Sequence, residues 1–351
     1  NKDTYMKILV TGGSGFIGTN FILKQLLKKN HIINVDKLSY ASNHTLNDSI
    51  KNKYYKFFKC NLCDYDLISK IIFNNKPDSI VHFAAESHVD RSIDSPSDCI
   101  NNNITGTLNL LQSSLNYRNK IRINLRFLHV STDEVFGSLG KSGLFTESSP
   151  YSPNSPYSAS KASSDHLVRA WIKTYNFPAI ITNCSNNYGP YQFPEKLIPL
   201  IIARSIDEKP LPVYGDGANI RDWLFVDDHC EALDIILNKA EVGDKFNIGG
   251  NNEVKNIEIV KTICNILDKL RPRKNNLSYS DLITFVKDRP GHDYRYAIDN
   301  SKIKSLLKWE PKETFDSGIQ KTIEWYLINE NWWRKIQQKT YNQKRLGLND
   351  S

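Results

Sequence analysis

Residues 7–18 read KILVTGGSGFIG, and this short stretch decides the fold of the chain. Residues 7–11 are mostly apolar and predict a buried strand, and the amphipathic stretch that ends near Lys29 predicts a helix. Gly12, Gly15 and Gly18 allow a tight turn between them and let a pyrophosphate approach the helix N-terminus. The pattern predicts a dinucleotide-binding turn, although a purely structural turn can look the same.

The next expected strand, 32–35, ends in Asp36. A carboxylate about 20 residues after such glycines can accept hydrogen bonds from the adenosine ribose hydroxyls. It would repel a 2′-phosphate, so it favours NAD over NADP as the cofactor. At this point the alternative that Asp36 only caps a turn stays open.

Strands and helices continue to alternate along the first half of the chain. Further strands are expected at 57–59, 79–83, 126–131 and 179–182, with helices between them. This alternation predicts an α/β fold with a Rossmann-type, doubly wound parallel sheet.

Beyond Gly189 the expected strands become short, and prolines and glycines cluster. This change predicts a smaller mixed α/β C-terminal substrate domain. The expected division is an NAD-binding Rossmann domain over 6–189, a mainly substrate-binding domain over 190–330 and a polar tail over 331–351. Part of 220–250 is also expected to join the Rossmann domain. Whether residues 1–5 are native stays open.

Composition excludes several classes of protein. Hydrophobic residues make up 40% of the 351 residues, enough for a packed core. The net charge of +8 comes from evenly spread lysines without an aromatic and basic stripe, so we expect no nucleic-acid binding. No apolar run approaches the length of about 18 residues that a membrane span needs, and no secretory signal is recognisable. We therefore expect a cytoplasmic protein that does not bind membranes.

The six cysteines are scattered along the chain, which indicates a reducing compartment. Cys60 and Cys63 have a metal-like spacing, but no second cysteine or histidine pair matches them. We expect no metal.

The stretch 131–161 contains the groups that can move protons. On a helix, Tyr157 and Lys161 are four residues apart and share a face. An ammonium group there should lower the pKa of the tyrosine, which could then take a proton from an alcohol whose carbon gives a hydride to a nicotinamide. Thr132 would help to hold that alcohol.

Asp133 and Glu134 suit a further step. When a sugar hydroxyl becomes a ketone, the neighbouring C–H becomes acidic. One carboxylate can remove that proton, and a carboxylic acid can protonate the hydroxyl one carbon further out, so that water leaves. An ordinary exposed acidic turn is the alternative.

These residues resemble the extended short-chain dehydrogenase/reductase superfamily and, within it, the nucleotide-sugar 4,6-dehydratases. The superfamily motifs are Gly12-x-x-Gly15-x-x-Gly18 and Tyr157-x-x-x-Lys161. More specific motifs are AAESHVDRS at 84–92, STDEV at 131–135, NCSNNYGP at 183–190, PEKLIP at 194–199, NIRDW at 219–223 and DRPGHD at 288–293. The resemblance covers nearly the whole chain.

The resemblance implies an enzyme that converts dTDP-glucose or UDP-glucose, or both, to the 4-keto-6-deoxy sugar. In the implied cycle Tyr157 deprotonates the 4-hydroxyl, Glu134 removes the C5 proton and Asp133 protonates the departing C6 hydroxyl. Hydride moves from C4 to NAD and returns to C6, so NAD is not consumed. The catalytic residues implied are Thr132, Asp133, Glu134, Tyr157 and Lys161.

The resemblance also implies binding residues and a homodimer. The expected cofactor-binding residues are Gly12, Gly15, Phe16, Ile17, Gly18, Asp36, Lys37, Ser39, Asn61, Leu62, Ala84, Ala85, Ser87, Tyr157, Lys161 and Asn187. The expected substrate-binding residues are His88, Thr132, Asn186, Glu195, Lys196, Tyr214, Arg221, Asn256, Arg289 and His292. Asn61 replaces the usual Asp near the adenine, and Phe136 replaces a usual Tyr.

Two other functions remain as alternatives. A nucleotide-sugar 4-epimerase on the same fold needs the tyrosine and the lysine but not the two carboxyls. A non-catalytic NAD-sensing regulator would tend to lose the tyrosine, the lysine or the glycines, and all are present. Preference for dTDP or UDP stays open because the two bases differ by one methyl group.

Overall fold

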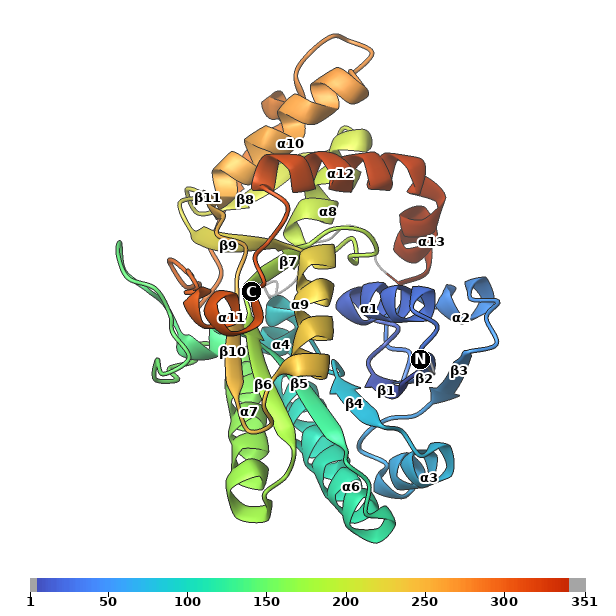
Figure 1. Cartoon of the computed structure of the whole chain (residues 1–351). Coiled ribbons are helices and arrows are strands. Elements are labelled where there is room, and N and C mark those ends of the chain that lie inside the picture. The colour runs from blue at the N-terminus through green and yellow to red at the C-terminus, as the bar shows by residue number, and fades with distance from the viewer. Residues whose placement is uncertain (1–4, 341–351) are drawn as a thin grey trace.

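The computed structural model describes residues 5–340 of the chain (Figure 1). Residues 1–4 and 341–351 lie outside this range. Most of the segment 1–5, whose native status is an open question, and the second half of the expected polar tail therefore lie outside the described residues.

A seven-stranded parallel sheet forms the centre of the structure, in the order β10-β6-β5-β4-β1-β2-β3. Its strands are β1 (Lys7–Thr11), β2 (His31–Asp36), β3 (Tyr55–Lys59), β4 (Ser79–His82), β5 (Arg126–Thr132), β6 (Ala179–Cys184) and β10 (Lys245–Ile248). This sheet confirms the predicted α/β fold of the Rossmann type.

Helices cover both faces of the sheet because successive residues of each strand point to opposite sides. In β1, Val10 packs into the core with α1 (Phe16–Leu27) and α9 (Val226–Lys239). Its neighbour Leu9 packs into the opposite core, together with side chains of the helices α3 (Tyr65–Asn75), α6 (Gly106–Ile121) and α7 (Pro156–Tyr175). Figure 1 shows α6 and α7 running side by side.

Short helices follow the carboxyl ends of β2, β4 and β5. They are α2 (Leu46–Ser49), α4 (Val89–Asp94), α5 (Pro96–Ile100), the π-helix Asn101–Thr105 that joins α5 to α6, and the 3₁₀ helix Asp133–Phe136 after β5.

The second half of the chain builds two small sheets, β11-β9-β7 and β12-β8. Their strands are β7 (Asn186–Tyr188), β8 (Leu211–Tyr214), β9 (Ile220–Phe225), β11 (Glu253–Lys255) and β12 (Ile283–Val286). The accompanying helices are α8 (Leu197–Ile206), α10 (Asn256–Leu270), the 3₁₀ helix Tyr279–Leu282, α11 (Ser301–Leu307) and α12 (Phe315–Ile328).

Between these small sheets the chain returns to the central one. After β9, helix α9 packs on the central sheet, and β10 pairs with β6 at its edge. The exact division into domains stays a prediction.

Residues 330–340 differ from the expectation of a polar tail because they form helix α13 (Glu330–Thr340). Trp333 is fully buried, and its indole nitrogen donates a hydrogen bond of 2.9 Å to the backbone oxygen of Tyr326. Trp332 packs edge-on against Trp325 of α12. Two adjacent tryptophans in an otherwise polar stretch indicate a helix that packs against the rest of the protein.

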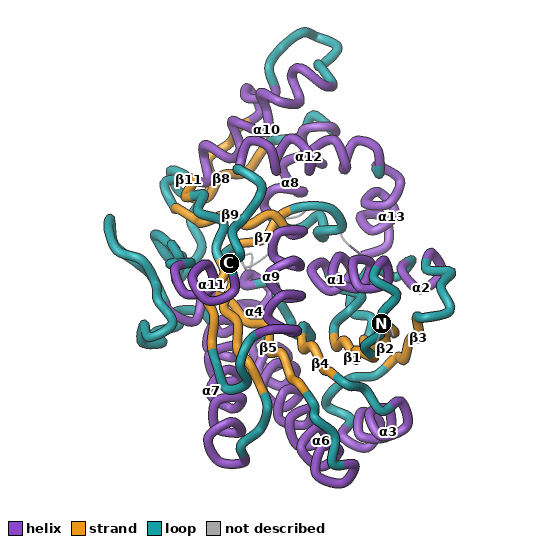
Figure 2. The backbone as a smooth tube through the Cα atoms, viewed as in Figure 1, coloured by secondary structure: helices purple, strands orange, loops and turns teal. Residues whose placement is uncertain are grey.

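A long loop, 137–155, connects the 3₁₀ helix after β5 to α7, and Figure 2 shows it extending from one side of the molecule. It is held by isolated bridges from Leu139 to Arg295 and from Phe145 to Ile298. Phe145 stacks on Phe136 with a centroid distance of 5.0 Å. The phenyl ring that replaces the usual tyrosine thus anchors this loop through apolar packing. None of the helices in the range 5–340 is long and apolar enough to cross a membrane.

Candidate active site

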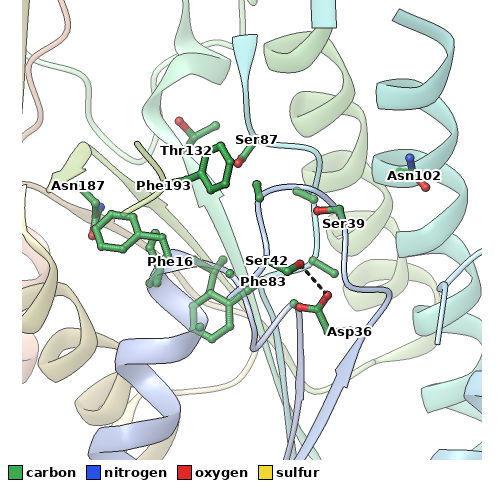
Figure 3. Close-up of a pocket in the computed structure, with 18 of the residues that line it drawn as sticks. Phe16, Asp36, Ser39, Ser42, Phe83, Ser87, Asn102, Thr132, Asn187 and Phe193 are labelled. Carbon is green, nitrogen blue, oxygen red and sulfur yellow. Dashed lines mark hydrogen bonds between the residues drawn. The ribbon is translucent and has the colours of Figure 1, made fainter. Parts of the chain in front are cut away.

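A cavity of about 310 Å³ lies along the carboxyl ends of the central strands. All of the residues predicted to bind the cofactor line it. Figure 3 shows Asp36, Ser39 and Ser42 in one part of it and Thr132, Ser87 and Phe193 in another. The wall also contains residues to which no sequence motif assigned a role: Val35, Ala41, Ser42, Cys60, Phe83, Asn102, Val130, Ser131, Cys184, Ser185, Gln192 and Phe193.

The glycine turn between β1 and α1 is closely packed on one side and open on the other. Gly12 has φ +69°, and a Cβ there would lie 2.6 Å from the backbone nitrogen of Ala84. A Cβ on Gly15, in contrast, would meet only the oxygen of Gly12, at 3.2 Å. Gly15 also precedes the first turn of α1, where free N–H groups favour an anion. The open side of the turn therefore fits a pyrophosphate.

Asp36 is held in place by the turn. One carboxylate oxygen accepts from the backbone nitrogen of Ser14 at 3.0 Å, and the other accepts from that of Leu38 at 2.7 Å and from the Ser42 hydroxyl at 3.3 Å. Asp36 thus joins β2 to the glycine turn, so it has a structural role as well as a place in the cavity wall.

The same part of the cavity contains the other residues expected near the adenosine. Lys37 forms an ion pair with Glu86, and Ser39 lies in the loop after β2. The side-chain oxygen of Asn61 accepts from the backbone nitrogen of Cys63 at 2.9 Å, and Leu62 follows it in the wall. An aspartate at position 61 could accept the same hydrogen bond. Asn61 therefore caps the turn in the same way but carries no negative charge.

Residues after β4 and β6 line the opposite part of the cavity. Ala84 and Ala85 leave space there, and the backbone oxygen of Ser87 accepts from the Lys196 ammonium at 2.7 Å. The side-chain oxygen of Asn187 lies 2.9 Å from Nδ1 of His229, which fixes the orientation of the amide. Neighbouring Asn186 also lines the cavity.

Thr132 and Glu134 lie at the end of β5, where the strand passes into a 3₁₀ helix. The Thr132 hydroxyl caps this helix by accepting from the backbone nitrogen of Glu134 at 3.2 Å, and it donates to the Glu134 carboxylate at 3.2 Å. Both residues line the cavity together with Tyr157 and Lys161 of α7. The structure thus gathers four of the five predicted catalytic residues around one space.

The predicted lowering of the Tyr157 pKa is wrong. Burial raises the pKa of Tyr157 well above its ordinary value, and the charge of Glu134 raises it further. Lys161 shares the helix face, but its ammonium donates to the backbone oxygen of Val130 at 3.3 Å. The helical spacing correctly placed Lys161 on the same face as Tyr157. It could not show how far burial removes water from the phenol, which is what raises the pKa of Tyr157.

Asp133 lies outside the cavity wall and is 1% exposed, so the alternative of an exposed acidic turn is wrong for this residue. Neither carboxyl oxygen has a hydrogen-bond partner within the protein. Burial raises the pKa of Asp133 well above its ordinary value, and Glu134 and Asp222 raise it further, while Arg221 opposes them. Burial and the neighbouring carboxyls therefore favour the protonated form of Asp133.

The expected substrate-binding residues Glu195 and His88 lie in one polar cluster. The Glu195 carboxylate accepts from Arg91 at 3.1 Å and from the Tyr40 hydroxyl at 3.0 Å, and Nε2 of His88 is 4.0 Å away. The Arg91 guanidinium stacks over the Tyr40 ring at 3.4 Å. Burial lowers the pKa of His88 well below its ordinary value, so its imidazole is neutral.

Asp90 connects two more of the expected substrate-binding residues. Its buried carboxylate accepts from Arg289 at 3.0 Å and from the Tyr214 hydroxyl at 2.9 Å. Arg289 follows β12 and Tyr214 ends β8, so α4 is tied to the second half of the chain through Asp90. The motif at 84–92 contained Asp90 and Arg91, but the sequence analysis assigned them no role.

Three expected substrate-binding residues remain. Arg221 donates to the backbone oxygen of Asp293 at 3.0 Å and stacks over Tyr296 at 4.4 Å. Nδ1 of His292 lies 2.6 Å from Asp288. Asn256 begins α10, and its side-chain oxygen is buried without a partner in the protein. Like His88, Tyr214 and Arg289, these three lie outside the wall of the main cavity.

Possible metal ligands in the structure are His, Cys, Asp and Glu side chains that lie close together. Residues 5–340 contain no group of three or more His, Cys, Asp or Glu side chains that could hold a metal ion. The six cysteines, all inside this range, are free thiols.

Comparisons with known proteins agree with this geometry. Residues 9–322 match the sequence model of the family described as GDP-mannose 4,6 dehydratase. The dTDP-glucose 4,6-dehydratase of Neisseria meningitidis is 53% identical over 351 residues, which cover 97% of this chain and 99% of that protein.

Solved structures are also similar. A dTDP-glucose 4,6-dehydratase of Bacillus anthracis in complex with NAD has a TM-score of 0.84 and 46% identity, and the match covers 94% of this chain and 99% of that one. The enzyme of the same description from Streptomyces venezuelae, also with NAD bound, has a TM-score of 0.86 and 41% identity, with coverages of 94% and 100%.

The open side of the glycine turn leads to a first prediction. A methyl group in Gly15→Ala would occupy the space beside Gly12 that a pyrophosphate needs, so the Kd for NAD should rise about tenfold or more. Isothermal titration calorimetry measures this Kd. Gly140→Ala is the control, because a Cβ there meets nothing within 4 Å. An unchanged Kd in Gly15→Ala would show that the dinucleotide does not approach this turn.

Proposed function

Because the chain belongs to the nucleotide-sugar 4,6-dehydratase family of the extended short-chain dehydrogenases/reductases, we propose that it converts dTDP-glucose to the 4-keto-6-deoxy sugar, with NAD as a cofactor that is regenerated. The residues along the cavity fit NAD: the open face of Gly15 suits the pyrophosphate and Asp36 suits the ribose. When bound, NAD accepts the hydride from C4 of the sugar and later returns it to C6.

The contrast between Asp133 and Glu134 is the observation that carries this proposal. Asp133 is buried without a hydrogen-bond partner, which favours its protonated form, whereas Glu134 lines the cavity and receives a hydrogen bond from Thr132. Two adjacent carboxyls in such different environments suit one acid and one base. In the proposed elimination, Glu134 removes the C5 proton and Asp133 gives its proton to the C6 hydroxyl, which leaves as water.

Tyr157 and Lys161 serve the first step. The Tyr157 phenol lies in the cavity beside Thr132, and in the proposal it takes the proton of the sugar 4-hydroxyl. Its raised pKa means that this transfer needs positive charge nearby. Lys161, which lies in the same wall, supplies a positive charge from one turn further along α7.

The nucleotide part of the substrate would bind towards the second half of the chain. Arg221 and Arg289 carry planar guanidinium groups that match a diphosphate, and Lys196 adds an ammonium group. Asn256 has a buried side-chain oxygen without a protein partner, which suits a donor on a pyrimidine base. These assignments extend the motifs of the family to the positions found here.

A 4-epimerase, the alternative enzyme, would also use Tyr157 and Lys161. It has no step that needs a protonated carboxyl, and a buried carboxyl without any hydrogen-bond partner is costly to keep. Asp133 therefore favours the dehydratase. The intact glycine turn and the Tyr157–Lys161 pair likewise disfavour a non-catalytic NAD-sensing regulator.

The free thiols of all six cysteines suit a reducing compartment, and we include a cytoplasmic location in the proposal.

The first test is incubation of the purified protein with dTDP-glucose or UDP-glucose, without an added reductant. We expect loss of one water from dTDP-glucose, measured by mass spectrometry, and a kcat/KM for UDP-glucose that is about tenfold lower because one methyl contact is missing. A galactose-type product without loss of water would overturn the dehydratase in favour of the epimerase.

Asp133→Asn should separate oxidation from elimination. The amide cannot donate an acidic proton to the C6 hydroxyl, so the rate of product formation should fall about a hundredfold or more. The 4-hydroxyl can still be oxidised, and reduced nicotinamide should accumulate on the enzyme, which its near-ultraviolet absorbance measures. The exposed substitution Asp66→Asn is the control. Full activity of Asp133→Asn would exclude Asp133 as the acid.

We also propose a homodimer that pairs α6 and α7 with their copies, as is usual in the family. Apolar side chains on the outer surface of these helices, among them Leu108, Ile121 and Tyr175, support it. In Leu108→Glu a buried charge would weaken the interface, so light scattering after size exclusion should show half the mass of the wild type. Leu144→Glu, in the long loop, is the control. A monomeric wild type would contradict the proposal.

A further inference from the structure

Asp165 is a buried acidic residue that the proposed reaction does not use. It lies on α7, one turn beyond Lys161 and two turns beyond Tyr157, so the three residues follow one face of the helix. It is only 2% exposed. A carboxyl in such a place is costly unless donors and opposite charges surround it.

Three donors hold the Asp165 carboxylate. One oxygen accepts from Nε2 of His129 on β5 at 2.9 Å. The other accepts from the Tyr151 hydroxyl of the long loop at 2.8 Å and from the side-chain amide of Asn183 on β6 at 3.0 Å. The same Asn183 amide donates to the backbone oxygen of Thr132 at 2.9 Å, so this cluster extends to the active site.

All three donors are neutral. Burial lowers the pKa of His129, so its imidazole is uncharged, and Tyr151 and Asn183 carry no charge. Within residues 5–340, the ion pair that Asp165 can form is with His129, and it requires a protonated imidazole. The donors therefore orient the carboxylate and keep it ionised, but its negative charge is left to act on a cation further away.

Two lysines feel this charge, Lys245 on β10 and Lys161 on α7, and the one that lines the active site is Lys161. Its side chain is 4% exposed, and the one hydrogen bond of its ammonium goes to the backbone oxygen of Val130 at 3.3 Å. Burial lowers the pKa of Lys161, and the charge of Asp165 is the largest effect that opposes this lowering. Without a nearby anion, an ammonium group at this depth would tend to lose its proton.

Glu134, on the 3₁₀ helix after β5, is the other carboxylate in the cavity wall that Lys161 lines. The other titratable groups that interact with Lys161 are His82 on β4, His129 on β5, Cys184 on β6 and Cys99 on α5, and Tyr157 lies one turn earlier on its own helix. Burial keeps both imidazoles, both thiols and the phenol neutral. Lys245, from β10, faces the other side of the cluster, where its ammonium donates to the Tyr151 hydroxyl at 2.8 Å.

We infer that Asp165 is a positioning residue, held by His129, Tyr151 and Asn183, that keeps the Lys161 ammonium charged and in place beneath Tyr157. The inference rests on the proposed function, because Lys161 matters to catalysis only if Tyr157 must lose its proton. It adds a residue that makes no contact with substrate or cofactor but supplies the negative charge on which the charge of Lys161 depends.

Asp165→Asn removes the charge and keeps the shape. Nδ1 of His129 has no partner, so the imidazole can move its proton to that nitrogen and accept from the new amide with Nε2. The amide oxygen can still accept from Tyr151 and Asn183. If this variant fails to fold, Asp165→Ser removes the same charge and leaves room for water.

The charge of Lys161 can be measured directly in ligand-free protein with ¹³Cε-labelled lysine, by NMR titration, with Lys161→Met to assign the signal. Loss of the anion disfavours the ammonium form, so in Asp165→Asn the pKa of Lys161 should fall by about one unit or more. The alkaline limb of kcat/KM for dTDP-glucose should move to lower pH by the same amount, since activity is lost once Lys161 is neutral.

Asp66→Asn is the control, because it removes an acidic charge at an exposed position outside this cluster. It should keep the lysine titration and the alkaline limb of the wild type. An unchanged Lys161 pKa in Asp165→Asn, even with lower activity, would overturn the inference and leave Asp165 a structural residue. Absence of dehydratase activity in the wild type would overturn the proposed function, whereas the lysine titration would still decide what Asp165 does.

Discussion

Removal of water from charged groups is the constraint on which the site depends. Tyr157, Lys161 and Asp133 are all nearly buried, and burial is the largest influence on the pKa of each. Burial favours the protonated forms of the tyrosine and the aspartic acid, which are neutral. It disfavours the protonated form of the lysine, which is charged. The surrounding residues oppose the effect of burial on the pKa at one of these groups but not at another. Asp165 opposes the effect on Lys161, whereas Asp133 is left without a hydrogen-bond partner, which favours its protonated form.

Local patterns in the sequence predicted much of this arrangement. The glycine turn, Asp36 and the Tyr157–Lys161 pair lie at fixed spacings within single strand–turn–helix units, and such units fold much as their spacing implies. The parallel strands then bring their carboxyl ends to one edge, which explains why every residue expected to contact the cofactor lines one cavity.

The rest depends on contacts between distant segments, which no local pattern contains. Phe193 and Gln192 enter the cavity wall because the chain after β7 folds back over the sheet. Asp165 gains its role from donors on β5, on β6 and in the long loop. The pKa of Tyr157 was predicted in the wrong direction because spacing shows which charges are near but not how much water is excluded.

The return of the chain to the central sheet after β9 affects how the protein can form during synthesis. Strand β10 and helix α9 are made only after β7, β8 and β9, yet they complete one edge and one face of the first sheet. A nascent chain that ends near Gly189 would leave the apolar side chains that α9 covers in contact with water. The central sheet therefore cannot be completed until the chain has been made at least as far as Ile248, well beyond Gly189.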